Sequence, residues 1–197
     1  MSNNRLIVGL TGVFGSGKST VGRILKRIGA RKVIDSDRLA HEVFQAKHPV
    51  GRKIKALFGM KTLNRKIIAR EVFSSPRKRK RLEAIVDPYV QRRIRSELKR
   101  VQKGIVIVEV PLLFETGFDR MCDVTVAVLT GKRNIMKQLV NSGFSSDEVC
   151  ARLRAQLPER VKKKRADLYI QNSGSKSLLA QRTKLLWEKL ESILSRS

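Results

Sequence analysis

The chain has 197 residues, and it is poor in acidic residues, cysteine and aromatic side chains and has no long apolar run. A transmembrane helix needs ~20 consecutive apolar residues, and no stretch approaches that length, so we expect no contact with a membrane. The apolar residues 6–10 run directly into a glycine-containing loop. That arrangement is typical of a buried strand and differs from a signal peptide.

Cysteine is nearly absent, because the chain has only Cys122 and Cys150. These two residues are not spaced as metal ligands, and sparse, unpaired cysteines are typical of a reducing compartment. A chain of this length can bury roughly 70% of its unfolded surface, so it needs no disulfide or structural metal to hold a core. We therefore expect a cytoplasmic protein without a disulfide framework.

Acidic residues are scarce: the chain has 17 Asp and Glu against 43 Lys and Arg, and its formal net charge is +26. Such a charge attracts polyanions without choosing among nucleotides, phosphorylated metabolites and nucleic acids. Aromatic residues make up only 5% of the chain, and none are interleaved with the basic runs as base-stacking platforms. Contact with nucleic acid is therefore expected only as non-specific electrostatics.

Short apolar runs alternate with segments of helical periodicity, which predicts an α/β fold with a mainly parallel sheet. The expected strands cover residues 6–10, 32–34, 105–110, 124–129 and 168–170, and the expected helical segments cover 18–28, about 38–102, about 134–166 and 178–194. We expect one domain, residues 1–197. Its two long helical segments are expected as insertions over the carboxyl edge of the sheet, where such sheets bind ligands.

Two local patterns predict where elements end. Ser75-Pro76 and Asp87-Pro88 each place a capping side chain before a proline, which is favoured at helix starts, so a helix is expected to begin at each. Asp35 and Asp37 follow the second strand, and residues two apart in a strand point to the same side. We expect both carboxylates there, with Asp35 more suited to capping or pairing and Asp37 to catalysis.

The segment from Gly12 to Ser19, Gly-Val-Phe-Gly-Ser-Gly-Lys-Ser, matches the phosphate-binding pattern G-x-x-x-x-G-K-[ST] between a strand and a helix. Glycines let backbone N–H groups turn toward an anion at the positive end of the helix. Lys18 is expected to reach the β and γ phosphates, and Ser19 to hold Mg²⁺. The pattern predicts a P-loop NTPase three-layer sandwich, and the short chain without a guanine-reading segment favours a small-molecule kinase.

A kinase needs an acid at the acceptor hydroxyl and cations around the transferred phosphate. Asp37 is the predicted catalytic acid. Glu109 ends the apolar run at 105–108 in the third expected strand, where an acid can assist Mg²⁺ through water. A basic helical lid is expected over about residues 131–166.

At these residues the sequence resembles the dephospho-coenzyme A kinase family through nearly its whole length. Besides the phosphate loop, the similar segments are Val33-Ile34-Asp35-Ser36-Asp37, Val110-Pro111-Leu112-Leu113-Phe114-Glu115, Arg152-Leu153-x-x-Gln156, Ala166-Asp167 and Ile170-Gln171-Asn172-Ser173-Gly174. The resemblance implies ATP-dependent phosphorylation of the ribose 3′-hydroxyl of dephospho-CoA, with Mg²⁺, in the last step of coenzyme A synthesis.

The resemblance also implies residue roles. The catalytic residues would be Asp37, Lys18 and Arg152, the acceptor-binding residues Asp37, Arg65, Glu109 and Lys162, and the metal-binding residue Ser19. The ATP-binding residues would be Gly12, Gly15, Ser16, Gly17, Lys18, Ser19, Thr20 and Asn172, the last beside the adenine. The insertion at about 38–103 would bind CoA.

Four positions depart from the family pattern: Val13 and Asn141 replace a usual glycine and a usual lid arginine, and Asn64 and Asp87 replace a usual acid and a usual histidine. Lys137 or Arg154 could substitute for the lid arginine. Two alternatives stay open: a kinase of another nucleoside or nucleotide, and a basic RNA-binding P-loop protein. We expect a monomer or a weak oligomer.

Overall fold

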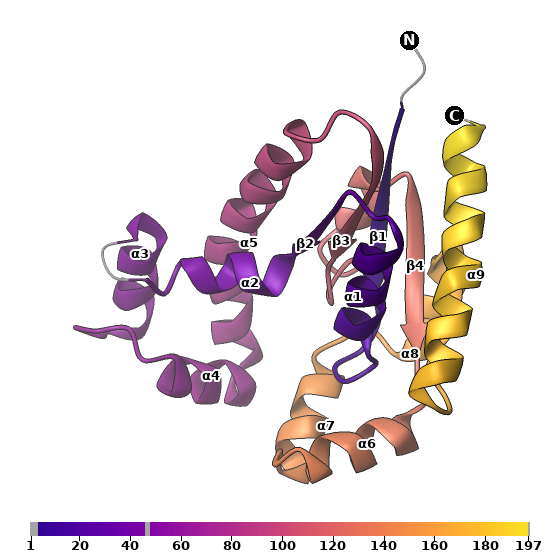
Figure 1. Cartoon of the computed structure of the whole chain (residues 1–197). Helices are drawn as coiled ribbons and strands as arrows, with labels where there is room; N and C mark the ends of the chain where they lie inside the picture. Colours follow the sequence, from indigo (N-terminus) through magenta and orange to yellow (C-terminus); the bar gives the residue numbers. More distant parts are fainter. Residues whose placement is uncertain (1–3, 46–47, 197) are drawn as a thin grey trace. The chain divides into compact units, whose positions relative to one another are not determined.

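The computed structural model describes residues 4–45 and 48–196. The chain forms two compact units: the first comprises residues 1–34 and 98–197, and the second comprises residues 35–97. The first unit holds the sheet and the second is helical (Figure 1). The second unit covers most of the segment expected as an insertion, about residues 38–103. None of the helices in the described ranges is long and apolar enough to cross a membrane.

The sheet has five strands in the order β2-β3-β1-β4-β5. They are β1 (Arg5–Thr11), β2 (Lys32–Asp35), β3 (Gly104–Glu109), β4 (Val124–Leu129) and β5 (Leu168–Gln171). β1 pairs in parallel with β3 and β4, and β4 pairs in parallel with β5. The central strands are buried on both faces, as their continuous apolar runs indicate. The predicted strands and the mainly parallel sheet are confirmed.

Two helices cover one face of this sheet: α1 (Lys18–Ile28) and α9 (Lys176–Ser195), which lie against each other (Figure 1). Val21 and Leu25 of α1 and Leu186 and Leu190 of α9 join the main apolar core with side chains of β1, β3, β4 and β5. Trp187 packs against that core. The chain between β4 and β5 forms α6 (Lys132–Asn141), α7 (Ser146–Arg154) and α8 (Glu159–Arg165), which confirms the predicted helical excursion.

The second unit consists of α2 (Ser36–Glu42), α3 (Pro49–Phe58), α4 (Arg65–Ser74) and most of α5 (Pro76–Lys99). Its core gathers around the buried residues Val43, Ile54 and Ile68. His48 caps α3 by accepting from the Val50 N–H, and Asn64 caps α4 by accepting from the N–H groups of Lys66 and Ile67. The cap explains how Asn64 serves where an acid is usual, because Asn and Asp cap helices equally well.

Two of the local predictions are wrong. β2 ends at Asp35, whose carboxylate Oδ1 accepts from the N–H groups of Asp37 and Arg38, so the helix begins at Ser36 and Asp37 lies in its first turn. The two acids therefore do not share one side of a strand. The second error concerns Pro88, which lies inside α5. Of the two predicted starts, only Pro76 begins a helix. Pro88 is tolerated inside α5 because the backbone hydrogen bond that it costs can be offset by tertiary packing.

Candidate active site at the phosphate loop

The loop between β1 and α1 has the backbone conformation of an anion cradle. Gly12, Gly15 and Gly17 all have positive φ angles, of 153°, 76° and 92°. Gly17 is also the N-cap of α1, and a Cβ at this position would overlap the side-chain nitrogen of Asn172. Left-handed backbone and close packing both demand glycine here. The predicted glycines thus turn the chain so that the helix begins with its N–H groups facing the loop.

The side chains of the loop supply cationic and hydroxyl groups. Lys18 Nζ donates to the backbone oxygens of Gly12 and Val13, at 2.8 and 3.1 Å, so the ammonium lies over the loop itself. Ser19 is exposed in the first turn of α1. Ser16 Oγ is buried and has no hydrogen-bond partner within the described ranges. The chain therefore leaves a polar group unsatisfied in this loop, and an anion could satisfy it.

Thr20, which was predicted with the ATP-binding set, lies further along α1. Its hydroxyl accepts from the Arg23 guanidinium at 3.2 Å.

Two side chains that follow other strands of the sheet bind the loop at Ser16. The Asn172 amide and the Thr130 hydroxyl each donate to the Ser16 carbonyl oxygen at 2.8 Å. Asn172 follows β5 and Thr130 follows β4, so both come from carboxyl ends of neighbouring strands. Sequence reasoning missed Thr130. A polar residue directly after a buried strand was the available signal.

Glu109 is buried at the carboxyl end of β3. Its carboxylate reaches α1, because a Cβ at Gly22 would overlap Glu109 Oε1. A glycine in the middle of α1 therefore makes room for an acid one helical turn beyond the phosphate loop. The predicted acid at the end of this strand is thus placed close to the loop helix.

Lid residues pack directly on the phosphate loop. The Arg152 guanidinium of α7 lies over the Phe14 ring at 4.5 Å and over the Phe144 ring at 5.0 Å, and it pairs with Glu148 at 2.8 Å. Gln156 Oε1 accepts from the Phe14 N–H at 2.8 Å. The structure therefore brings the predicted Arg152 to the loop, where it stacks on Phe14 and pairs with Glu148.

The packing of Val13 explains why valine stands where the family usually has glycine. Its side chain is only 4% exposed and belongs to an apolar cluster with Ile135 and Leu139 of α6 and Val149 of α7. The branched side chain thus anchors the lid helices to the phosphate loop. Beside it lies a pocket of about 430 Å³, which Arg154 also lines.

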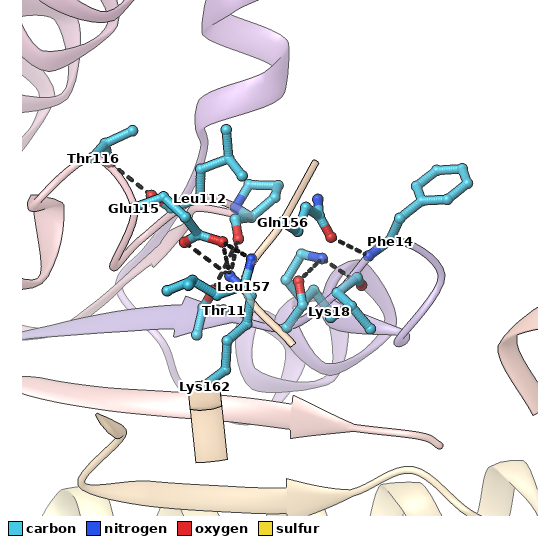
Figure 2. Close-up of polar contacts among 12 residues, drawn as sticks. Thr11, Phe14, Lys18, Leu112, Glu115, Thr116, Gln156, Leu157 and Lys162 are labelled. Carbon is cyan, nitrogen blue, oxygen red and sulfur yellow. Dashed lines mark hydrogen bonds and ion pairs between the residues drawn. The ribbon is translucent and has the colours of Figure 1, made fainter. Parts of the chain in front are cut away.

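Lys162 is fully buried and bound to the chain's own oxygens (Figure 2). Its Nζ donates to Glu115 Oε1 and Oε2 at 2.7 and 3.0 Å and to the Pro111 carbonyl at 2.7 Å. Burial lowers the pKa of Lys162, whereas the Glu115 carboxylate acts against that shift. An ammonium has three N–H groups, and these three bonds engage all of them. A phosphate contact by Lys162 stays a prediction that would require it to leave one of these oxygens.

The remaining predicted residues lie in the second unit. Asp37 lies in the first turn of α2, and Arg65 begins α4. An Arg65 guanidinium nitrogen lies 2.7 Å from His41 Nε2, and the same guanidinium lies over the Phe44 ring at 5.7 Å. The fold thus joins Arg65 to the helix that carries Asp37, which the sequence spacing of 28 residues did not reveal.

No cluster of three or more His, Cys, Asp or Glu side chains that could hold a metal occurs among the described residues. Mg²⁺ suits such a site poorly in any case, because in kinases it is held by substrate phosphates and one or two protein oxygens. The exposed Ser19 hydroxyl beside the anion cradle fits that pattern.

The parallel sheet, the glycine cradle before α1 and the basic lid helices packed on it define a P-loop kinase. The family model described as dephospho-CoA kinase matches residues 6–177. The chain belongs to the dephospho-CoA kinase family.

Individual relatives agree with this assignment. A dephospho-CoA kinase of Thermus thermophilus is 38% identical over 172 residues, which cover 86% of this chain and 84% of that protein. A crystal structure of a Thermus thermophilus protein, TT1252, matches with a TM-score of 0.80 at 38% identity and covers 95% of this chain and 98% of that one. The dephospho-CoA kinase structure from Campylobacter jejuni matches with a TM-score of 0.68 at 27% identity, with coverage of 95% and 98%.

Proposed function

We propose that this chain transfers the γ-phosphoryl group of ATP to the ribose 3′-hydroxyl of dephospho-CoA, which gives coenzyme A and ADP. The observation that carries the proposal is the family match over residues 6–177, which includes the phosphate loop and the lid. The 3′-oxygen forms the new bond to phosphorus while the bond to the β-phosphate oxygen breaks. The proton of the hydroxyl passes to a carboxylate.

The nucleotide side of the reaction is assigned to the phosphate loop and its neighbours. The backbone of Gly12 to Ser19 would bind the phosphates, and Lys18 would move from the Gly12 and Val13 carbonyls to the β and γ phosphates. When bound, Mg²⁺ neutralises charge on those phosphates. The Ser19 hydroxyl would hold it, and Arg152 would bring positive charge to the transferred group.

Asn172 donates to the Ser16 carbonyl. We propose that it supports the loop in addition to its predicted place beside the adenine.

The acceptor side is assigned to Asp37, Arg65, Glu109 and Lys162, with Asp37 as the acid that orients the hydroxyl and receives its proton. An anionic acceptor suits the second unit, which has a pocket of about 330 Å³ lined in part by Arg52, Lys55 and Lys61. Dephospho-CoA carries a pyrophosphate, so cations in such a pocket favour it over an uncharged nucleoside. We propose the cytoplasm as the site of action.

The direct test incubates the purified chain with ATP, Mg²⁺ and dephospho-CoA and identifies the product by mass spectrometry. Adenosine and AMP as competing acceptors separate this proposal from a nucleoside or nucleotide kinase. Preferred phosphorylation of either competitor would contradict the proposal.

The role of Asp37 is tested by Asp37→Asn, which removes the proton acceptor and keeps the shape of the side chain. We expect turnover to fall by at least ~10²-fold, with ATP affinity changed less than about twofold. Asp35→Asn is the matched control, because asparagine preserves the cap of α2 and the control should retain turnover. Equal turnover in the Asp37 variant and the wild type would remove Asp37 from the mechanism.

A further inference from the structure

A buried ion pair outside the phosphate loop is connected to the loop at two points. Glu115 lies in the turns that follow β3, and Lys162 lies in α8. Lys162 is fully buried and the Glu115 side chain is 18% exposed. Burying such a pair costs free energy unless further hydrogen bonds satisfy its polar atoms. Lys162 and Glu115 each make such a bond to the backbone, and both bonds lead toward the phosphate loop.

The first connection runs through Pro111. The Pro111 carbonyl accepts from Lys162 Nζ at 2.7 Å and also from the Thr11 hydroxyl at 3.2 Å. Thr11 is fully buried and is the last residue of β1, directly before the phosphate loop. The ion pair is thereby joined to the residue at which the loop begins.

The second connection runs through the segment between α7 and α8. Glu115 Oε1 accepts from the Leu157 N–H at 2.8 Å, and the preceding residue, Gln156, accepts from the Phe14 N–H at 2.8 Å (Figure 2). Phe14 lies within the phosphate loop, two residues after Gly12. The ion pair therefore also fixes a point inside the loop.

These bonds form a closed circuit through Thr11, Phe14, Gln156, Leu157 and the ion pair. We propose that Glu115 and Gln156 are positioning residues that hold the first half of the phosphate loop in its nucleotide-binding conformation. Neither side chain needs to touch the nucleotide for this role. A loop that is already ordered loses less conformational entropy when it binds a ligand.

The proposal rests on ATP as the ligand of the loop, so its test has one readout that needs no nucleotide. The first variant is Gln156→Ala. The second is the pair Glu115→Met with Lys162→Met, which replaces the ion pair by apolar side chains of similar volume. Such replacements are often neutral or stabilising, so loss of folding is not expected. The third combines all three substitutions.

The control is Thr116→Val. It removes a hydroxyl that donates to the Leu112 carbonyl at 2.8 Å in the same turns but has no bond to Leu157 or Lys162.

Without nucleotide, hydrogen exchange at the Phe14 amide, followed by NMR, should become at least ~10-fold faster in Gln156→Ala and in the Met pair, and should stay unchanged in Thr116→Val. ATP affinity, measured by calorimetry, should fall about five- to tenfold in both variants. The triple variant should bind less than about twofold more weakly than Gln156→Ala, because residues acting through one another are not additive.

Unchanged Phe14 exchange in the Met pair would overturn the proposal, and so would independent losses of ATP affinity that multiply in the triple variant. A direct phosphate contact by Lys162 would give a different pattern, with weaker ATP binding but normal Phe14 exchange. Absence of ATP binding by the wild type would contradict the proposed function. The exchange measurement would still show whether Glu115 and Gln156 hold the phosphate loop.

Discussion

Gly22 makes room for the Glu109 carboxylate because glycine has no side chain. In a helix interior alanine is favoured over glycine by roughly 1 kcal/mol, yet α1 has glycine where a Cβ would overlap Glu109 Oε1. Both residues are buried, so neither can move into solvent. The Glu109 carboxylate therefore leaves room only for glycine at position 22.

We expect Gly22→Ala to reverse the usual helix preference. The variant should lower the free energy of unfolding by about 1–3 kcal/mol, the range for overpacking, and should reduce turnover because Glu109 is displaced beside the phosphate loop. Chemical denaturation and steady-state kinetics measure both effects. Gly22→Ala with Glu109→Ala should recover the stability without the turnover. A stabilised and fully active Gly22→Ala protein would show that the carboxylate has room elsewhere.

The partly buried carboxyl of Asp87 makes the stability of the protein depend on pH. Burial, reinforced by the nearby Glu83 carboxylate, raises the pKa of Asp87 to about 6. The folded chain thus binds this proton more tightly than the unfolded chain does. The associated stability is present below about pH 4, is lost as the pH rises toward 6, and stays lost above it.

We therefore expect Asp87→Asn to stabilise the protein at pH 7 and not at pH 4. Allowing for partial solvent screening, the gain at pH 7 should be about 1 kcal/mol, or roughly 2–4 °C in the thermal midpoint. Thermal melts across pH 4–8 check the profile. Glu191→Gln removes the same charge from an exposed site on α9 and should shift the midpoint by less than ~1 °C. A gain of equal size at pH 4 would contradict this explanation.

At the scale of elements, the lid is fastened to the phosphate loop by apolar contact at Val13. Val13→Gly restores the glycine usual in the family but deletes a side chain that is 4% exposed and packed against α6 and α7. We expect it to weaken this cluster by about 1–3 kcal/mol. Hydrogen exchange should accelerate in residues 132–154 while the strands of the sheet keep their protection. Uniform acceleration throughout the first unit would instead indicate a global loss of stability.

The elements themselves were largely predictable from the sequence, because the buried strands are continuous apolar runs and the helices have regular apolar spacing. The errors fell where two local rules compete. The sequence favours Asp35 as the capping acid, and the structure confirms it, but the cap ends β2 at Asp35 and leaves Asp37 in the helix, where strand alternation no longer applies. Asp87-Pro88 matches a helix start, but the apolar side chains on either side continue one long helix through it.

The candidate site was predictable only in part. The phosphate loop is a local motif and could be read directly. The bonds of Gln156 to Phe14, of Glu115 to Leu157 and of Thr130 to Ser16 join residues 42 or more positions apart on different elements. Ordinary Gln, Glu and Thr side chains carry no sequence signal for such pairings, which depend on how the strands and loops pack.

At the scale of the whole molecule, the net charge of +26 exceeds anything that the active site requires. Only a few cations can contact two anionic substrates, so the remainder acts through the long-range field. Such a field speeds the encounter with anions and is screened by salt, with a Debye length of about 10 Å at 0.1 M and about 3 Å at 1 M. The charge should therefore influence substrate capture more than the chemical step.

We expect KM for ATP and for dephospho-CoA to rise several-fold between 50 and 500 mM KCl while kcat changes by less than about twofold. Heparin, a polyanion unrelated to either substrate, should inhibit at low salt and lose its effect at high salt, because it competes for the same field. Steady-state kinetics over a salt series test both points, with the viscosity held constant. If KM stayed constant while kcat fell, the cations would be acting on the transferred phosphate and not on capture, and the excess charge would need a different explanation.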